Sequence, residues 1–236
     1  MVRWWQFAKK GKTTMLDIFE ILGPVMVGPS SSHTAGAVRI GRMARTLLDG
    51  EPVRAKIGLY GSFAETGQGH GTDRALVAGL LGLKPDNMKI PNSFDLAQQR
   101  GLKFSFEEAH LRDAHPNTPV LEVERADGKV LTLQAASTGG GRIRVDKLNG
   151  VEVSFTGMFN TLVIRLKDIA GELADVTREL SNGRINIASM SLCRDRRGGD
   201  ALTVIETDQR VPPVVRQLIG ELPGVEGLTY YEKEED

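Results

Sequence analysis

The fold of the second half of the chain is decided by TLVIRLKDIAGELADV (Thr161–Val176) and the residues that follow it to Tyr231. Short apolar or alternating runs predict strands, and two longer stretches have the spacing of amphipathic helices. We expect strands at 161–166, 184–192, 201–207 and 225–231, and helices at 171–180 and 212–222. This order predicts a ferredoxin-like βαββαβ sandwich, an antiparallel sheet with both helices on one face.

The residue patterns of the N-terminal half differ from those of the second half, and we expect the N-terminal half to form a separate α/β (α+β) unit. The join lies within 146–157, so we place the two domains at residues 15–150 and 157–236. In the first domain we expect helices at 16–22, from Ala37 onward and at 74–81. A strand is expected where four apolar residues alternate: Val53, Ala55, Ile57 and Leu59. Residues 61–73 should form a polar turn, with Thr72 or Asp73 as the cap of the helix that follows. A hairpin at 121–135 should turn at Asp127-Gly128 through a type I′ turn, and Gly139–Gly141 should form a pliable loop.

Composition excludes several kinds of site. Lysine plus arginine and aspartate plus glutamate both number 30, so there is no general reason to expect nucleic acid or an anionic membrane as partner. No apolar run approaches the ~20 residues of a membrane span, and residues 1–14 lack the apolar stretch of a signal peptide, so we expect a cytoplasmic protein. Cys193 is the only cysteine, which excludes an internal disulfide and any zinc or cluster site built only from thiolates of this chain.

The polar turn Gly28–Gly36 (GPSSSHTAG) precedes the predicted helix from Ala37. Ser30–Thr34 therefore occupy the N-cap and first turn, where unpaired backbone amides attract an anion. The hydroxyls of Ser31, Ser32 and Thr34 and the His33 ring make this turn a candidate seat for a carboxylate or a phosphate. The alternative is that one serine caps the helix and the others are merely solvated.

Three histidines lie in polar turns: His33, His70 and His115. An imidazole titrates near neutral pH, so each is a candidate catalytic acid or base. Each could equally form hydrogen bonds that hold its own turn. No pair of histidines has the spacing of zinc ligands on a helix, so we expect no metal site in this chain.

Four motifs occur in order along the first half: GPSSSHTAGAVRIGRMA (28–44), YGSFAETGQGHGTDRALVAGLLG (60–82), HPNT (115–118) and GGG (139–141). Together they resemble the beta chain of the iron-sulfur-dependent L-serine dehydratases (L-serine ammonia-lyases). The second half resembles an ACT domain, and the likeness covers residues 15–232. It implies a first domain similar to the allosteric substrate-binding domain of some phosphoglycerate dehydrogenases.

The resemblance implies deamination of L-serine to pyruvate and ammonia. In two-chain members a [4Fe-4S] cluster on a separate alpha chain polarises the substrate hydroxyl, and the lone Cys193 agrees with that division. The chain alone should then be inactive. The resemblance points to a set of substrate- or anion-binding residues: Ser31, Ser32, His33, Thr34, His70, Thr72 and Asn117.

The likeness to ACT domains implies an amino-acid effector, L-serine or another, held mainly by backbone groups and often across a dimer interface. The matching positions are Asp168, Ala170, Gly171, Asn186 and Ile187. Many relatives have Arg-Pro where this chain has Ile169-Ala170, so the alternative is a domain kept only for dimerisation. A homodimer is expected, because a second copy can pair the exposed sheet edges. One rival function is a freestanding serine sensor without catalysis. Another, suggested by the anion-friendly turn at 30–34, is a phosphoglycerate dehydrogenase relative that has lost its catalytic part.

Overall fold

A computed structural model describes residues 25–233, and the expected helix at 16–22 lies outside these residues. The first sheet has the order β2-β1-β3-β4-β5-β6. Its strands are β1 (Pro52–Tyr60), β2 (Lys103–Glu108), β3 (Thr118–Arg125), β4 (Val130–Gly139), β5 (Arg142–Leu148) and β6 (Val151–Phe155). β1 and β2 are parallel, and the remaining neighbours are antiparallel. The α/β class is confirmed.

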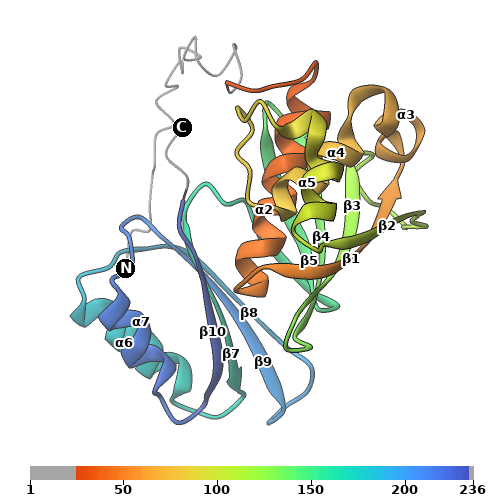
Figure 1. The fold of residues 1–236 in the computed structure, drawn as a ribbon. Coiled ribbons are helices and arrows are strands. Elements are labelled where there is room, and N and C mark those ends of the chain that lie inside the picture. Colours follow the sequence, from red (N-terminus) through yellow and green to blue (C-terminus); the bar gives the residue numbers. More distant parts are fainter. Residues whose placement is uncertain (1–24, 234–236) are drawn as a thin grey trace, which may run out of the picture.

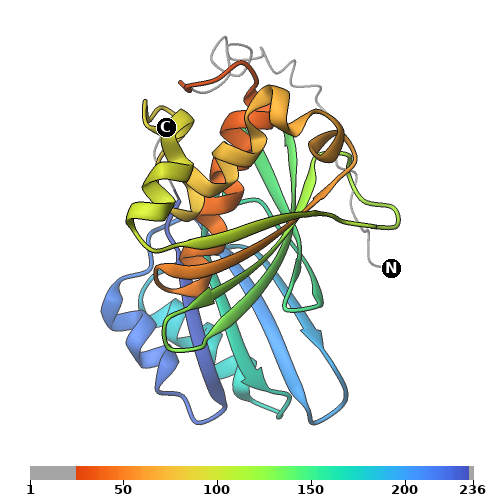
Figure 2. The same cartoon turned by 45° about the vertical axis from the view of Figure 1, so that its right-hand side comes forward.

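Helices cover one face of this sheet (Figure 1), and the turned view of Figure 2 shows the same layer over the strands. They are the π-helical turn η1 (Ser31–Gly36), α2 (Ala37–Leu48), α3 (Ser62–His70), α4 (Thr72–Leu80), the short turn η2 (Ile90–Asn92) and α5 (Ser93–Gln99). None of the helices between residues 25 and 233 is both long and apolar enough to cross a membrane. The cytoplasmic location stays a prediction.

The second sheet has the order β10-β7-β9-β8, with every neighbouring pair antiparallel. Its elements are β7 (Asn160–Lys167), α6 (Glu172–Asn182), β8 (Ile187–Arg194), β9 (Asp200–Thr207), α7 (Pro213–Gly220) and β10 (Val225–Tyr231). α6 and α7 lie together on one face of this sheet (Figure 1). The ferredoxin-like order predicted from the sequence is therefore confirmed.

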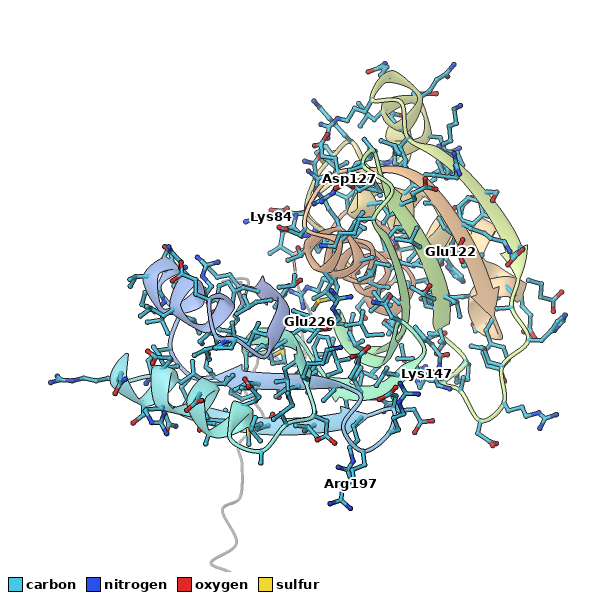
Figure 3. All side chains as sticks on the ribbon, turned by 90° about the horizontal axis from the view of Figure 1, so that it is seen from below. Lys84, Glu122, Asp127, Lys147, Arg197 and Glu226 are labelled. Atoms are coloured by element: carbon cyan, nitrogen blue, oxygen red, sulfur yellow. The ribbon has the colours of Figure 1, made fainter. Side chains whose placement is uncertain are left out.

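Strand β7 contributes to two apolar cores, because successive side chains of a strand point to opposite faces. Leu162 and Ile164 pack with the helices α6 and α7, whereas Val163 packs with the core of the first sheet. Val204 and Tyr231 join Val163 on that second face. The first and second sheets consequently share buried contacts, and the view from below in Figure 3 shows side chains packed between the two units.

The helices α2 and α4 cross at a pair of glycines. A Cβ atom on Gly41 would lie 2.4 Å from the carbonyl oxygen of Leu76, and one on Gly79 would lie 2.2 Å from that of Val38. Real Cβ atoms do not approach backbone atoms so closely, so glycine is what allows this crossing. The crossing matters for the site, since η1 leads directly into α2 and α3 leads into α4.

Residues 61–73 are not a turn, which corrects the sequence prediction. Ser62–His70 form helix α3 although Gly67 and Gly69 lower its helix propensity. Phe63 is fully buried beneath this helix, so tertiary packing outweighs local preference. The predicted cap was also wrong: Gly71, with a φ of 69°, is the N-cap of α4, and Thr72 is its first residue.

Two local predictions in strands also fail. Val53 is exposed, because a register shift between Pro52 and Arg54 interrupts the alternation of β1. At the β3–β4 hairpin only Gly128 has a positive φ, 86°, whereas a type I′ turn needs two such residues. The Gly128 amide donates to Arg125 O, and the Arg125 amide to Lys129 O. This pattern is typical of a three-residue loop with a bulge at Gly128.

Candidate functional site

The polar turn before α2 is built around the side chain of Ser30. Ser30 has an extended backbone (φ −141°), and its Oγ accepts a hydrogen bond of 3.1 Å from the amide of His33. The Thr34 amide donates to Ser30 O at 2.9 Å. One serine therefore caps the helix, as the sequence suggested, and Ser31 and Ser32 remain partly exposed with no capping task.

The imidazole of His33 is held by hydroxyl groups of α3. Its Nε2 lies 3.1 Å from Ser62 Oγ and 3.1 Å from Thr66 Oγ1, and its Nδ1 lies 3.4 Å from Ser30 Oγ. The ring also contacts two neighbouring rings, with centroid distances of 5.2 Å to Phe63 and 5.0 Å to His70. The His33 side chain is thus fixed in orientation while remaining partly open to solvent.

The environment favours the neutral form of His33. Burial is the larger cause that lowers the pKa of His33 from its ordinary value of 6.5, and the neighbouring charge of His70 lowers it further. A hydrogen bond with Ser62 opposes this shift without cancelling it. A neutral imidazole has one nitrogen free to accept a proton, so His33 is suited to act as a base near neutral pH.

The other two motifs reach the same place. The amide of Ser137, at the end of β4, donates to Asn117 O at 2.9 Å, and its hydroxyl donates to Ser32 O at 2.9 Å. A Cβ on Gly139 would lie 4.0 Å from Ser32 Oγ, so the triple-glycine loop borders η1. The Phe63 amide donates to Pro116 O at 3.5 Å, which joins α3 to the His-Pro-Asn-Thr segment. Four motifs distant in sequence thus meet around η1.

Some of the predicted site residues do not add a side chain to the polar groups around His33. His115 accepts a hydrogen bond from the Asn117 amide at 3.1 Å through Nδ1, which holds its own turn. Thr34 and Thr72 are buried, and the Thr34 hydroxyl donates to His70 O at 3.5 Å. His70 itself is exposed. The roles assigned to these residues stay predictions.

Ser62, Thr66 and Ser137 belong to the site although the sequence did not single them out. Ser62 and Thr66 are four residues apart and therefore share one face of a helix, but 61–73 was interpreted as a turn. The position of Ser137 beside Ser32 depends on how β4 passes under η1, a contact across 105 residues. No local signal reveals it.

The residues predicted to bind an effector form two separate groups. The Asp168 carboxylate accepts hydrogen bonds of 2.9 Å from the Gly198 amide and of 2.9 Å from Arg194 Nη1, and these two interactions lower its pKa. The side-chain nitrogen of Asn186 donates to the Asp208 carboxylate, and the backbone amide of Asn186 donates to the side-chain oxygen of Gln209.

These two groups lie at opposite ends of the second sheet. Along β9, Asp200 pairs with Lys167 at one end and Thr207 pairs with Ile187 at the other. Asp168, Ala170 and Gly171 follow the first of these pairs, and Asn186 precedes the second. One copy of the chain does not bring them together.

The donors of this chain do not fit an iron-sulfur cluster. A cluster is held by several thiolates, and Cys193 is the only cysteine. Its thiol lies 3.2 Å from Glu152 O, on the strand pair β6–β8, away from His33. Within residues 25–233 there is also no group of three histidine, cysteine or acidic side chains arranged for a metal ion.

Comparison with known proteins gives two matches to family models: the serine dehydratase beta chain over residues 14–101 and the ACT domain over residues 160–224. The chain is 39% identical over 213 residues to a probable L-serine dehydratase beta chain of Bacillus subtilis, covering 90% of this chain and 96% of that one. It is 36% identical over 217 residues to the L-serine dehydratase beta chain of Peptoniphilus asaccharolyticus, covering 92% and 96%. An L-serine dehydratase of Streptomyces coelicolor is 33% identical over 150 residues, 53% of this chain and 33% of that one.

Proposed function

Because the chain belongs to the family of L-serine dehydratase beta chains, we propose that it is one component of a lyase that converts L-serine to pyruvate and ammonia. The observation that carries this proposal is the meeting of four separate motifs around η1, the turn that contains His33. The similar chains favour this function over a freestanding amino-acid sensor, since they are named as dehydratase beta chains.

The proposal includes a partner. The [4Fe-4S] cluster would belong to an alpha chain, because this chain has a single thiolate to offer. What this chain supplies is a set of polar groups: the amides and hydroxyls of η1, the hydroxyls of α3 and one neutral imidazole. The isolated chain is then expected to be inactive.

The polar cluster suits the chemistry of serine. Elimination of water from L-serine removes the α-hydrogen as a proton and the β-hydroxyl as the leaving group. We assign binding of the substrate carboxylate to Ser31, Ser32 and the first amides of η1, where a helix start favours an anion. The His33 ring would accept the proton, with Ser62 and Thr66 fixing the orientation of the ring through their contacts with Nε2.

Reconstitution tests the proposal. The chain, an alpha-type chain carrying its cluster, and their mixture are assayed anaerobically for pyruvate formed from L-serine. We expect pyruvate from the mixture alone, because neither chain holds the complete site. Pyruvate formed by this chain without partner or iron would show the division of labour to be wrong. L-serine binding to this chain with no activity gained on mixing would favour the sensor instead.

We further propose that residues 15–150 carry the serine site and that 157–236 form an ACT-like regulatory domain. Val151–Phe155 form the edge strand β6 of the first sheet, so these residues belong with the first unit. The regulatory site would be completed by a second copy, because Asp168 and Asn186 lie at opposite ends of one sheet. This arrangement supports a homodimer with an amino acid, such as L-serine, at the junction.

Mixing two variants tests this shared site. Asp168→Ala and Asn186→Ala are each expected to abolish effector binding by the second domain, since each removes one half of both sites. In a dimer made of one copy of each variant, one of the two sites keeps both residues, so random mixing should restore about a quarter of the sites. Calorimetry with L-serine measures the recovery, with an excess of one variant as the control. No recovery in mixed dimers would contradict the shared site.

A further inference from the structure

The neutral ring of His33 carries one proton, and the hydroxyls around the ring decide which of its two nitrogens holds that proton. Nε2 lies 3.1 Å from both Ser62 Oγ and Thr66 Oγ1, and Nδ1 lies 3.4 Å from Ser30 Oγ. A hydroxyl donates only one hydrogen bond, so each contact depends on where the hydroxyl sends its own proton. Only the ring nitrogen without a proton can act as a base.

The hydroxyl proton of Thr66 is already engaged in α3. Thr66 Oγ1 donates to Ser62 O at 2.8 Å, one turn earlier in the helix, and a carbonyl oxygen can only accept. This distance is shorter than the 3.1 Å between Thr66 Oγ1 and Nε2 of His33. The Thr66 oxygen therefore presents a lone pair to the ring, which attracts an N–H group and repels a bare nitrogen. Nε2 of His33 is consequently the donor.

Ser30 completes the same pattern on the other side of the ring. Its Oγ accepts a hydrogen bond from the His33 amide at 3.1 Å, which leaves the Ser30 proton available to Nδ1. A proton on Nδ1 would instead require Ser30 Oγ to accept from the amide and from the ring at once. The backbone of Ser62 raises the pKa of His33, which is the effect of an acceptor that faces a ring N–H group.

We propose that Thr66 is a positioning residue that keeps the proton of neutral His33 on Nε2 and leaves Nδ1 as the basic nitrogen. Nδ1 lies beside Ser30, at the start of η1, where the carboxylate of serine would bind. The place of the proton is a property of this chain alone, whereas the use of Nδ1 as a base rests on the function proposed above. Once Nδ1 accepts a proton the ring is a cation, and the hydrogen bond from Nε2 to Thr66 becomes charge-assisted and stronger.

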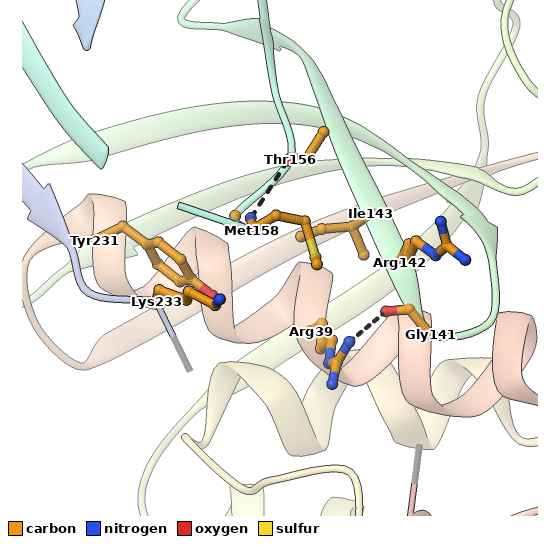
Figure 4. Close-up of a pocket in the computed structure, with 9 residues that line it drawn as sticks. Arg39, Gly141, Arg142, Ile143, Thr156, Met158, Tyr231 and Lys233 are labelled. Carbon is orange, nitrogen blue, oxygen red and sulfur yellow. Dashed lines mark hydrogen bonds between the residues drawn. The ribbon is translucent and has the colours of Figure 1, made fainter. Parts of the chain in front are cut away.

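The backbone around the ring has anchors that do not involve the Thr66 hydroxyl. Ser137 Oγ donates to Ser32 O, and Arg39 Nη1 donates to Gly141 O in the triple-glycine loop that borders η1 (Figure 4). Thr66 itself is exposed. Removing its hydroxyl should therefore change the hydrogen bonds of the ring while η1 and α3 stay folded.

NMR of the histidine ring nitrogens in the full chain tests the place of the proton without an alpha chain. In mildly alkaline buffer the ring is neutral, because its pKa is lowered from 6.5, and the shifts of Nδ1 and Nε2 report which of them is protonated. His33→Ala identifies the signals of this ring. We expect the proton on Nε2, and a ratio of the Nε2–H form to the Nδ1–H form that falls about fivefold in Thr66→Val, because one hydrogen bond is lost.

Two variants control for other effects of the substitution. Thr66→Ser keeps the hydroxyl and should hold the ratio within about twofold of the unmodified chain. Thr177→Val removes a hydroxyl that also donates to a carbonyl of its own helix, Ala174 O at 3.0 Å, but lies in α6 of the second unit. It should leave the His33 signals unchanged. A proton on Nδ1 in the unmodified chain, or equal ratios in Thr66→Val and Thr66→Ser, would overturn the proposal.

The reconstituted dehydratase gives the second readout. Thr66→Val should lower kcat about tenfold and change KM for L-serine less than about twofold, since the lost hydrogen bond is strongest once the ring is charged. Thr66→Ser should restore kcat to within about threefold of the unmodified protein. An unchanged kcat in Thr66→Val would overturn the positioning role of Thr66. If the mixture with the alpha chain forms no pyruvate at all, the proposed function fails, and the NMR result still decides the place of the proton.

Discussion

Replacing His33 with alanine is expected to lower kcat of the reconstituted dehydratase by about 10²–10⁴-fold, the range for removal of a positioned acid or base. The His33 ring is held through Nε2 by Ser62 and Thr66, and its pKa is lowered, so it is set up to accept a proton. It is only partly buried, so the free energy of unfolding should change by no more than about 1 kcal/mol.

His110→Ala is the matched control, since His110 is exposed and lies outside the four motifs. Its activity and melting temperature should both match those of the unmodified protein. A large loss of stability in His33→Ala, parallel to its loss of activity, would show that His33 serves the structure of the turn. Unchanged activity in His33→Ala would contradict both its catalytic role and its role in binding serine.

The pH dependence supplies a second readout for the same residue. The unfolded chain protonates His33 near pH 6.5, whereas the folded chain does so only at a lower pH because burial and His70 disfavour the charge. The contribution of the neutral ring to stability is therefore complete above pH 6.5 and is lost as the pH falls through the lowered pKa. We expect His33→Ala to remove this component from the pH profile of the melting temperature. Activity should likewise decline only below pH 6.5.

Replacing Gly79 with alanine is expected to lower the free energy of unfolding by about 3 kcal/mol and the melting temperature by about 6–12 °C. The added Cβ would lie 2.2 Å from Val38 O and 2.9 Å from the Arg42 amide nitrogen, and neither backbone atom can rotate away. Helices α2 and α4 would have to move apart. Thermal unfolding followed by circular dichroism measures the loss.

Gly220→Ala controls for the conformational effect of the same substitution. Gly220 is the last residue of α7, and a Cβ there meets no atom within 4 Å. Alanine has the higher helix propensity, so this variant should be unchanged or more stable by up to about 1 kcal/mol. An equal loss in both variants would show that the contact at the α2–α4 crossing does not account for the effect.

Local patterns in the sequence were sufficient to predict the strands and helices of the second unit. The short apolar runs in 161–166 and 201–207 and the helical spacing in 171–180 predict elements that the structure contains, because a short apolar run is typical of a strand buried on both faces and the helical spacing marks one apolar side of a helix. The Ser30 cap was likewise predictable, since a cap forms with residues three positions away. The four motifs also indicated the family, which the comparisons show.

Contacts between residues distant in the sequence decided helix α3 and the assembly of the site. Helix α3 forms against its glycine content because Phe63 is buried beneath it, and only this helix places Ser62 and Thr66 on His33. Likewise, only the strand order places Asp168 and Asn186 at opposite ends of the sheet. The sequence by itself determined the strands and helices of the second unit and the family of the chain. The tertiary structure decided which of their side chains meet, because packing energy depends on neighbours that no local pattern names.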